Sequence, residues 1–437
     1  MRNLIRILCL VLCLSVLPVV GMAEEEKITI TITDWNTGLA SELQKAACEE
    51  YMQLHPNIII DHQTIPYDEY HTKLNTLIAA NECPDIYYVS DQQAIAWGEY
   101  GTAADLKALY AADGIDMTEK FLPAAMYGTN DKIYGLAYGV VDMVMYYNKA
   151  VYDAAGVEYP STDALNPITW ADWAESLKLL TVDFNGKHPG EEGFNAMGVK
   201  TYGTLLPSWE YALSALLSSN GASFFDNDAV ALGTPEAKEV LSAVYKLLED
   251  QVAPTPIAQS ALPSVAQMFV DGQLATYIGG SFDYGDIAAE IPDIGVAPLP
   301  MFKEPKTVGW AACSEISAKT EHMDEVFAFF RWYHEADTNK CHLKTNLPNE
   351  YRYYQDEDLI ATWLTAENFN DDYRTVIPVQ MANYAVTPEM DIVKNASQIF
   401  EEYVKSTLDM LWLGEKNVDE VVEILEADLS DIYEGKW

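Results

Sequence analysis

The chain has 437 residues, which is too long for one compact core and enough for two domains. Its 67 acidic and 26 basic residues give a formal net charge of −41, so the surface repels nucleic acid and anionic lipid and excludes both as partners. The 27 Tyr and 10 Trp offer flat apolar faces with a polar tip, which suit sugar rings but also fill large cores.

The first 23 residues have the features of a secretory signal. Arg2 and Arg6 precede an apolar run at 7–20, and the segment ends in the small residue Ala23. The run is too short to predict a membrane span. We therefore expect cleavage after Ala23 and export to the periplasm or cell surface. Lipid attachment at Cys13 is disfavoured because Leu12, not a small residue, precedes it.

Four cysteines remain after this segment, and their state is left open. Four thiols allow three pairings, and the sequence does not choose among them. Export permits disulfides, but free buried thiols are equally consistent with a core of this size. No CxxC spacing is present, so we expect no zinc site or redox motif. The residues are Cys48, Cys83, Cys313 and Cys341.

Strands and helices alternate in the first hundred residues. Strands are predicted at 27–33, 57–61 and 86–89, with helices at 39–54 and 68–80 between them. This alternation predicts a parallel sheet. Ligands of open parallel sheets lie at the carboxyl ends of the strands, which points to the predicted loops at 34–38 and 90–93.

The stretch 132–156 organises the rest of the chain. A turn at Gly135 leads into an apolar run at 140–147, which reads as a buried strand, and a short helix follows until Gly156. Asp142 interrupts the apolar run. We interpret the run as a crossover strand between two domains, with Asp142 facing a cleft. The alternative is an ordinary core strand that tolerates an acid.

The remaining chain contains further amphipathic helices and short strands. The segment 294–299 is predicted to be a strand that returns to the first domain. Helices are predicted at 169–180, 207–219, 234–250, 265–270, 321–335 and 418–432, and strands at 274–278, 294–299 and 311–318.

Common catalytic and cofactor motifs are missing from the sequence. It contains no GxGxxG, P-loop, HExxH or GxSxG motif and no complete EF-hand loop. We therefore expect no cofactor, no metal and no enzymatic activity. A secreted carbohydrate-active enzyme with two acidic residues stays open as an alternative, because 67 acids offer many pairs.

Several short motifs together resemble one known family. The chain is similar to bacterial extracellular solute-binding proteins of the maltose-binding type, and the order of the motifs extends over nearly the whole mature chain. Asp131 and Ala137 depart from the Gly and Pro usual in that family. The matching motifs are Lys132-Ile133-Tyr134-Gly135-Leu136, Met145-Tyr146-Tyr147-Asn148-Lys149, Pro84-Asp85-Ile86-Tyr87, the Trp-bearing loop after the first strand, and 269–277.

The resemblance implies an α/β, two-lobe periplasmic-binding-protein fold of class II, with a hinge of crossover strands. One lobe would contain 24–137 plus 294–335, and the other 138–293 plus 336–437. The implied function is capture of a carbohydrate, an oligosaccharide, by a monomer that serves an ABC permease. A cationic or peptide solute, which the acidity permits, and a sensor role are alternatives within the same fold.

The candidate ligand-binding residues come from the resemblance and from their position on predicted loops. Phe282 and Tyr211 match positions that stack on sugar rings in that family, and Asp91 and Asp142 match positions that bond sugar hydroxyls. Loop or hinge position adds Trp35, Asn36, Tyr138, Trp209 and Trp310.

Overall fold

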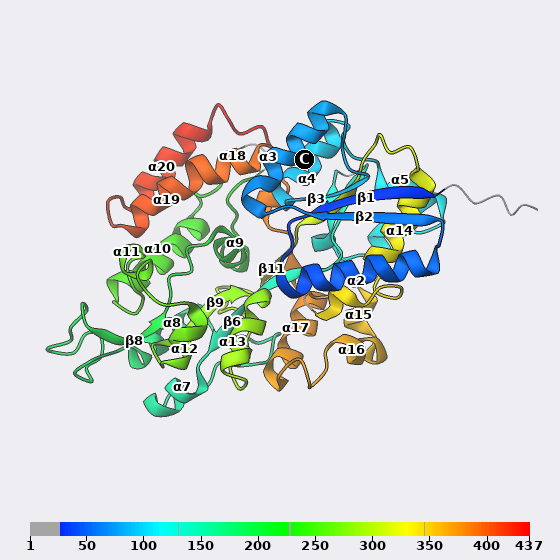
Figure 1. Cartoon of the computed structure of the whole chain (residues 1–437). Helices are drawn as coiled ribbons and strands as arrows, with labels where there is room; N and C mark the ends of the chain where they lie inside the picture. The colour runs from blue at the N-terminus through cyan, green and yellow to red at the C-terminus, as the bar shows by residue number, and fades with distance from the viewer. Residues whose placement is uncertain (1–26, 130, 227–228, 345) are drawn as a thin grey trace, which may run out of the picture.

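The structure is a computed structural model that describes residues 27–129, 131–226, 229–344 and 346–437. Within this part of the chain, two β-sheets form the centres of two lobes (Figure 1). The predicted signal segment and its cleavage site lie outside the described residues.

The first lobe is built on a six-stranded sheet with the order β2-β1-β3-β12-β5-β4. β1 pairs in parallel with both β2 and β3, which confirms the predicted parallel arrangement, whereas β12 is antiparallel to β3 and β5. The strands are β1 (Ile28–Asp34), β2 (Ile58–Thr64), β3 (Ile86–Val89), β4 (Met126–Gly128), β5 (Ile133–Leu136) and β12 (Cys313–Ile316).

Helices cover this first sheet. The predicted helices at 39–54, 68–80 and 321–335 are present, but the expected loop at 90–93 is wrong because a helix begins at Asp91. The helices are α2 (Gly38–Leu54), α3 (Tyr67–Ala80), α4 (Asp91–Glu99), α5 (Leu106–Ala112), α6 (Met117–Lys120) and α14 (Met323–His334).

The second lobe contains a seven-stranded sheet in the order β13-β11-β6-β9-β8-β7, with β10 also paired to β6. The chain enters it through the predicted strand at 140–147. The strands are β6 (Val141–Tyr147), β7 (Val182–Asp183), β8 (Val199–Thr204), β9 (Leu274–Gly280), β10 (Gly295–Ala297), β11 (Thr307–Trp310) and β13 (Ala385–Val386).

Most residues of β6 are apolar because both of its faces are buried. Val144 and Tyr146 belong to one hydrophobic cluster, while Met143, Met145 and Tyr147 belong to the other. Successive side chains of a strand point to opposite faces, so this alternation divides the strand between two cores. The burial of both faces explains why the sequence of β6 shows no polar face.

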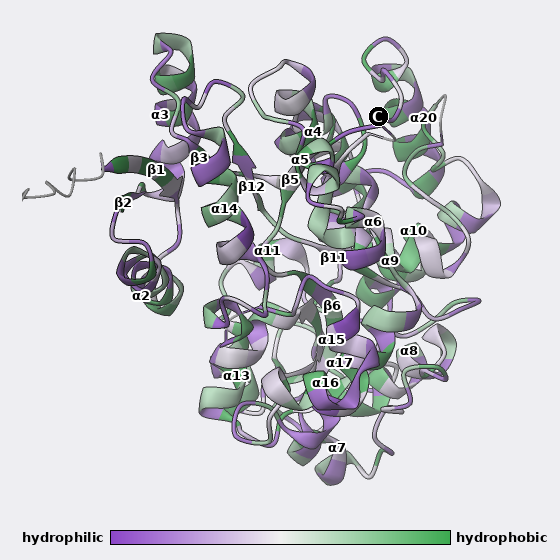
Figure 2. Cartoon of the chain, turned by 90° about the vertical axis from the view of Figure 1, so that its right-hand side faces the viewer, coloured by the Kyte–Doolittle hydropathy of each residue, from purple (hydrophilic) through white to green (hydrophobic). Residues whose placement is uncertain are grey.

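Helices pack around the second sheet, and those after residue 350 make up most of the C-terminal part of the chain. They carry hydrophilic and hydrophobic bands along their length (Figure 2), as expected for helices with one face on a core. The helices are α7 (Lys149–Ala155), α8 (Trp170–Leu180), α9 (Glu210–Ser219), α10 (Pro235–Glu249), α11 (Pro256–Gln259), α12 (Val265–Val270), α13 (Tyr284–Glu290), α15 (Arg352–Gln355), α16 (Glu357–Trp363), α17 (Asp371–Asn383), α18 (Ala396–Gln398), α19 (Lys405–Trp412) and α20 (Val418–Leu429).

The strand predicted at 294–299 exists as β10, but the prediction that it returns to the first lobe is wrong. Gly295, Val296 and Ala297 pair antiparallel with β6 of the second sheet. The next strand, β11, also pairs with β6, so the chain reaches the first sheet only at Cys313. A short apolar run identifies a strand but does not identify the sheet it joins.

Three segments connect the lobes. We call residues 137–140, between β5 and β6, the first crossover, and residues 311–312, between β11 and β12, the second. Residues 335–344 and 346–350, after α14, belong to the third crossover, and Leu347 there exchanges two backbone hydrogen bonds with Val140 of the first. The first and third crossovers are therefore paired.

The lobes also touch away from the crossovers. Helix α4 of the first lobe contacts α18 and the short helix η4 (Glu389–Asp391), which belong to the C-terminal part (Figure 1). The lobes therefore meet on two sides, at the crossovers and at α4.

Candidate functional site

Four of the predicted site residues form one aromatic cluster in the second lobe. Trp209 caps α9, Tyr211 is in its first turn, Phe282 follows β9, and Trp310 ends β11. Trp310 lies 4.3 Å from Tyr211 and 5.7 Å from Trp209 between ring centroids. Because Trp310 directly precedes the second crossover, the cluster lies where the chain passes between the lobes.

The four rings divide into a buried pair and an exposed pair. Tyr211 and Trp310 stack at an angle of 26° and are only 6% and 7% exposed. Trp209 and Phe282 are 38% and 49% exposed, and their planes stand 79° apart. The buried pair supports two exposed aromatic faces, which can pack against the apolar face of a ring-shaped solute.

Gly280 permits the position of Phe282. A Cβ added at Gly280 would lie 2.0 Å from Cε1 of the Phe282 ring, so the ring occupies the space that any other residue at 280 would need. The backbone carbonyl of Gly280 also accepts a hydrogen bond from the Tyr146 hydroxyl at 2.8 Å.

The first lobe contributes Trp35 and Asn36, which follow β1 at the carboxyl end of the sheet. The Trp35 indole packs against Tyr88 and Tyr70, with ring centroids at 4.5 and 4.9 Å. The Asn36 side chain is partly exposed and donates a hydrogen bond from Nδ2 to the hydroxyl of Tyr138 at 3.3 Å. The sequence predicted both Asn36 and Tyr138, and the structure brings them together.

Tyr138 lies in the first crossover and is 8% exposed. Its ring stacks on His342 of the third crossover at 3.9 Å and on Tyr88 of β3 at 5.6 Å. Burial raises the pKa of the Tyr138 phenol to about 12, so the hydroxyl stays protonated at neutral pH and can donate or accept a hydrogen bond.

Asp142 does not face a cleft, and that prediction is wrong. Its side chain is fully buried, and its Oδ2 accepts a hydrogen bond from Nε2 of Gln380 at 2.5 Å. Its Oδ1 has no hydrogen-bond partner among the described residues. Burial raises the pKa of this carboxyl to about 7. The structure thus matches the alternative in which a core strand tolerates an acid.

Asp91 is the first residue of α4, and its side chain lies outside the described part of the structure. Its predicted role in binding hydroxyl groups stays a prediction.

Sequence reasoning missed two residues beside Asn36. Nε2 of His62 on β2 lies 2.5 Å from Oδ2 of Asp34, the last residue of β1, and both side chains are 5% exposed. Oδ1 of Asp34 accepts from the backbone N–H of Asn36 at 2.9 Å. The only sequence signal is a His and an Asp near the carboxyl ends of two predicted parallel strands.

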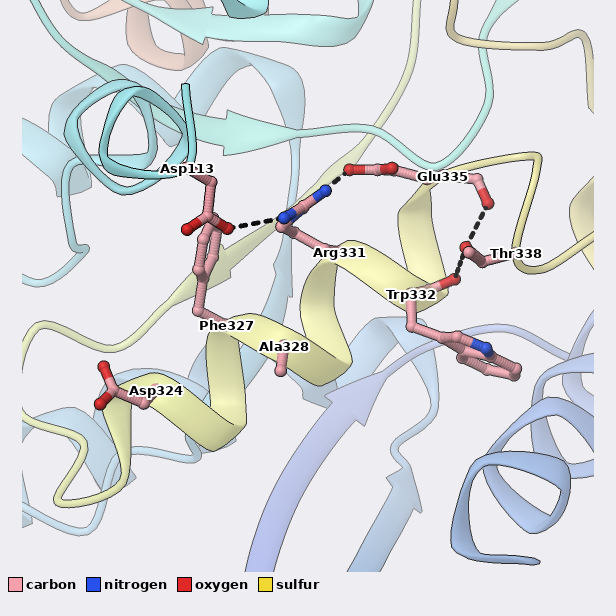
Figure 3. Close-up of a pocket in the computed structure, with 8 residues that line it drawn as sticks. All are labelled: Asp113, Asp324, Phe327, Ala328, Arg331, Trp332, Glu335 and Thr338. Atoms are coloured by element: carbon pink, nitrogen blue, oxygen red, sulfur yellow. Dashed lines mark hydrogen bonds and ion pairs between the residues drawn. The ribbon is translucent and has the colours of Figure 1, made fainter. Parts of the chain in front are cut away.

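A separate pocket lies on α14, away from the predicted site residues (Figure 3). Phe327, Arg331 and Trp332 line it, and Arg331 bridges Asp113 and Glu335 with N–O distances of 2.6 and 3.0 Å. The guanidinium is already paired with two carboxylates of the same lobe, so this pocket has a structural ion network rather than a free binding group.

The described residues include no group of three or more His, Cys, Asp or Glu that could hold a metal ion. The four cysteines, whose pairing the sequence left open, form no disulfide bond with one another in the structure. None of the helices within the described ranges has both the length and the apolarity to cross a membrane.

Comparison with known proteins identifies the family. The profile of the bacterial extracellular solute-binding proteins matches residues 35–340. The chain belongs to this family. Solute-binding proteins of this kind are extracellular, bind small solutes and work with ABC permeases, which confirms the resemblance inferred from the sequence.

Relatives of this solute-binding protein are distant in sequence. A binding protein of Brucella abortus is 25% identical over 297 residues, which span 66% of either chain. An arabinooligosaccharide-binding protein of Halalkalibacterium halodurans is 27% identical over 254 residues, which span 55% of this chain and 52% of the relative. The matched part thus covers less than two thirds of these relatives.

Solved structures show the same two-lobe fold over nearly the whole chain. An ABC substrate-binding protein of Listeria monocytogenes in complex with cycloalternan has a TM-score of 0.75 and 22% identity, and the match covers 93% of this chain and 99% of that one. The sugar-binding protein of Xanthomonas citri has a TM-score of 0.75 and 16% identity, with coverage of 93% and 97%. The predicted fold class is confirmed.

Proposed function

We propose that this solute-binding protein captures a carbohydrate, most simply an oligosaccharide, between its two lobes and delivers it to an ABC importer. The observation that carries the proposal is the pair of exposed rings, Trp209 and Phe282, supported by the stacked pair beneath them at the second crossover. Sugar-binding relatives and structural neighbours support the same ligand class.

Both lobes would contribute contacts to the bound solute. Aromatic faces of the second lobe would pack on the sugar rings, while Asn36 of the first lobe would bond hydroxyl groups. A solute drives closure only through its higher affinity for the closed state. Capture at micromolar concentration needs about 8 kcal/mol of net binding free energy, which a few stacked rings and hydrogen bonds can supply.

The proposal includes the remaining features inferred from the sequence. The protein is exported as a monomer after cleavage of residues 1–23 and has no enzymatic activity. The first lobe comprises 24–137 and about 313–335, and the second comprises 138–312 and most of 336–437. The boundary at 312 follows from the pairing of β10 and β11 with β6.

The ligand class is tested by calorimetry on the mature chain. The probes are arabinotriose, maltotriose and diacetylchitobiose, with spermidine and a tripeptide representing the alternative solutes. We expect saturable binding of at least one sugar and none of spermidine or the tripeptide. Binding of only spermidine or the tripeptide would overturn the carbohydrate proposal. Chromatography of the sugars after incubation tests for cleavage, and new products would support the enzyme alternative.

Two variants test the site itself. Trp209→Ala and Phe282→Ala should each weaken sugar binding about 10-fold, which corresponds to about 1.4 kcal/mol. Phe184→Ala is the matched control, because Phe184 is 74% exposed on a loop that follows β7. Equal affinity in all three variants and the wild type would place the solute elsewhere.

A further inference from the structure

We propose that His62 and Asp34 are positioning residues that hold Asn36 for the solute, and that Asn36 couples solute binding to the hinge through Tyr138. The inference rests on the proposed function for the identity of the solute. The contacts that carry it run from β2 to the first and third crossovers.

The first step holds the loop after β1 in place. Asp34 uses Oδ2 to bind Nε2 of His62 at 2.5 Å and Oδ1 to accept the backbone N–H of Asn36 at 2.9 Å. With both side chains 5% exposed, water cannot replace these contacts easily. His62 lies opposite Ile32 in the paired strands, so the sheet register fixes where the carboxylate is held.

The second step is a replaceable hydrogen bond. Asn36 donates to the Tyr138 hydroxyl at 3.3 Å, which is long for a hydrogen bond, and its side chain is partly exposed. An amide carries both donors and an acceptor, which suits a sugar hydroxyl. A solute that takes this amide would therefore compete with Tyr138 for it.

The third step leads to the hinge. Tyr138 belongs to the first crossover and stacks on His342 of the third at 3.9 Å. Two residues from Tyr138, Val140 exchanges backbone hydrogen bonds of 2.9 and 3.0 Å with Leu347. A change in the hydrogen bonding of Tyr138 thus acts on two paired crossovers, which are the segments that must bend when the lobes move.

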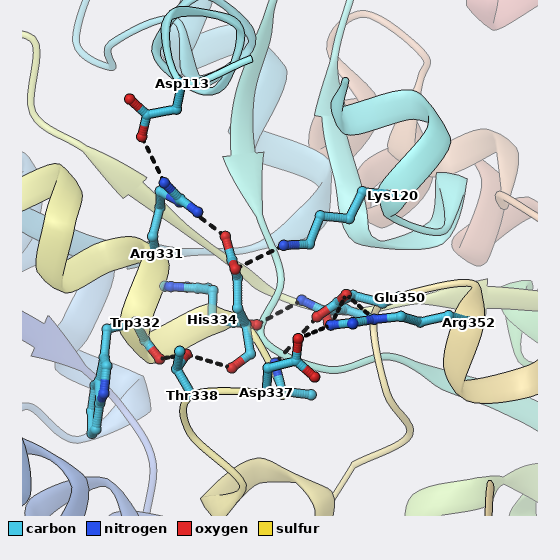
Figure 4. Close-up of polar contacts among 12 residues, drawn as sticks. Asp113, Lys120, Arg331, Trp332, His334, Asp337, Thr338, Glu350 and Arg352 are labelled. Carbon is cyan, nitrogen blue, oxygen red and sulfur yellow. Dashed lines mark hydrogen bonds and ion pairs between the residues drawn. The ribbon is translucent and has the colours of Figure 1, made fainter. Parts of the chain in front are cut away.

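Ion pairs hold the start and the end of the third crossover together. Lys120 binds Glu335 at 2.7 Å, Arg352 binds Glu350 at 2.8 Å, and Arg352 also pairs with Asp337 (Figure 4). Lys120 thus ties the start of this crossover to the first lobe, and Arg352 ties its start to its end. His342, which stacks on Tyr138, lies between these two braced ends.

Amide hydrogen exchange of the unliganded protein tests the coupling without a solute. Tyr138→Phe removes the hydroxyl and keeps the stacked ring. We expect the Val140 and Leu347 amides to exchange about 10-fold faster in this variant, as for the loss of about one hydrogen bond. Tyr134→Phe is the control, because the Tyr134 hydroxyl bonds Glu99 at 2.6 Å in the same lobe. Unchanged exchange at both amides would overturn the coupling.

Binding of the sugar probes tests the positioning role. His62→Ala should weaken binding about 10-fold, while His62→Gln, whose amide Nε2 can still donate to Asp34, should restore it to within about 2-fold of the wild type. Weak binding by both variants, or by neither, would overturn the positioning role. If the wild type binds no sugar, the proposed function fails, and the exchange experiment still decides whether the Tyr138 hydroxyl is coupled to the hinge.

Discussion

The side-chain amide of Asn349 donates a hydrogen bond to the backbone carbonyl of Ala137 at 2.8 Å. The same Nδ2 donates to the carbonyl of His334 at 3.1 Å, and the residue is fully buried. One amide therefore joins the start of the first crossover to the residue that precedes the third.

Replacing Asn349 by Ala should leave both carbonyls without this donor in a buried place. We expect the free energy of unfolding to fall by about 2 kcal/mol, because an unsatisfied buried polar group costs about 1–3 kcal/mol. Urea denaturation measures the change. Asn166→Ala is the control, since Asn166 lies on the surface and bonds only the nearby Asp163. An equal and small effect in both variants would show that the amide does not stabilise the crossovers.

Asp142 should make stability depend on pH. Burial raises the pKa of its carboxyl to about 7, whereas an unfolded Asp has a pKa of about 4. Below pH 4 both states are protonated and the residue contributes nothing. As the pH rises to 7 the unfolded state ionises first, so the folded state loses stability, and above 7 the loss is constant.

Asp142→Asn removes this loss and keeps an oxygen that can accept from Gln380. At pH 8 we expect the variant to be more stable than the wild type by on the order of a few kcal/mol, with the difference vanishing towards pH 4. Thermal unfolding from pH 4 to 9 measures it. Asp271→Asn, at an exposed position, should follow the wild-type profile. A pH-independent difference would mean that Asp142 is ionised in the folded protein.

The sequence predicted the elements of this fold better than their assembly. The strand 86–89 and the helix 265–270 have the predicted bounds, because Pro84 and the Asp271-Gly272 turn mark their ends. Asp142 was placed wrongly because its partner, Gln380, lies 238 residues further along the chain. The local sequence shows that a strand contains an acidic residue. It does not show whether an amide from a distant part of the chain donates a hydrogen bond to that residue.

The candidate site shows the same limit. Loop position selected Trp209 and Trp310, and the family resemblance selected Tyr211 and Phe282. The structure joins all four in one cluster. His62 was missed because its role depends on Asp34 of the neighbouring strand, which only the register of β1 and β2 reveals. A contact between two strands can be predicted only when their pairing in the sheet is known, whereas turns and strand ends can be recognised from the sequence of a single segment.

Trp310 and Trp209 belong to one cluster but should respond differently to truncation. Trp310→Ala empties a site that is 7% exposed and should cost about 3–5 kcal/mol of stability. Trp209→Ala removes a ring that is 38% exposed and should cost less than about 1.5 kcal/mol while weakening solute binding. Chemical denaturation of both variants checks this order. A larger loss of stability for Trp209→Ala than for Trp310→Ala would contradict the division of the cluster into a buried supporting pair and an exposed pair that contacts the solute.

Gly280→Ala should displace a binding ring without unfolding the protein. The new Cβ would lie 2.0 Å from the Phe282 ring, but that ring is 49% exposed and can swing outward. The backbone of Gly280 has φ −79° and ψ 152°, which Ala adopts without strain. We expect a change in unfolding free energy below about 1 kcal/mol and a loss of sugar affinity similar to that of Phe282→Ala.

Gly285→Ala is the control, because a Cβ there meets no atom within 4 Å. Calorimetry and denaturation of both variants decide the matter, and normal sugar affinity in Gly280→Ala would show that the solute does not depend on where the Phe282 ring lies.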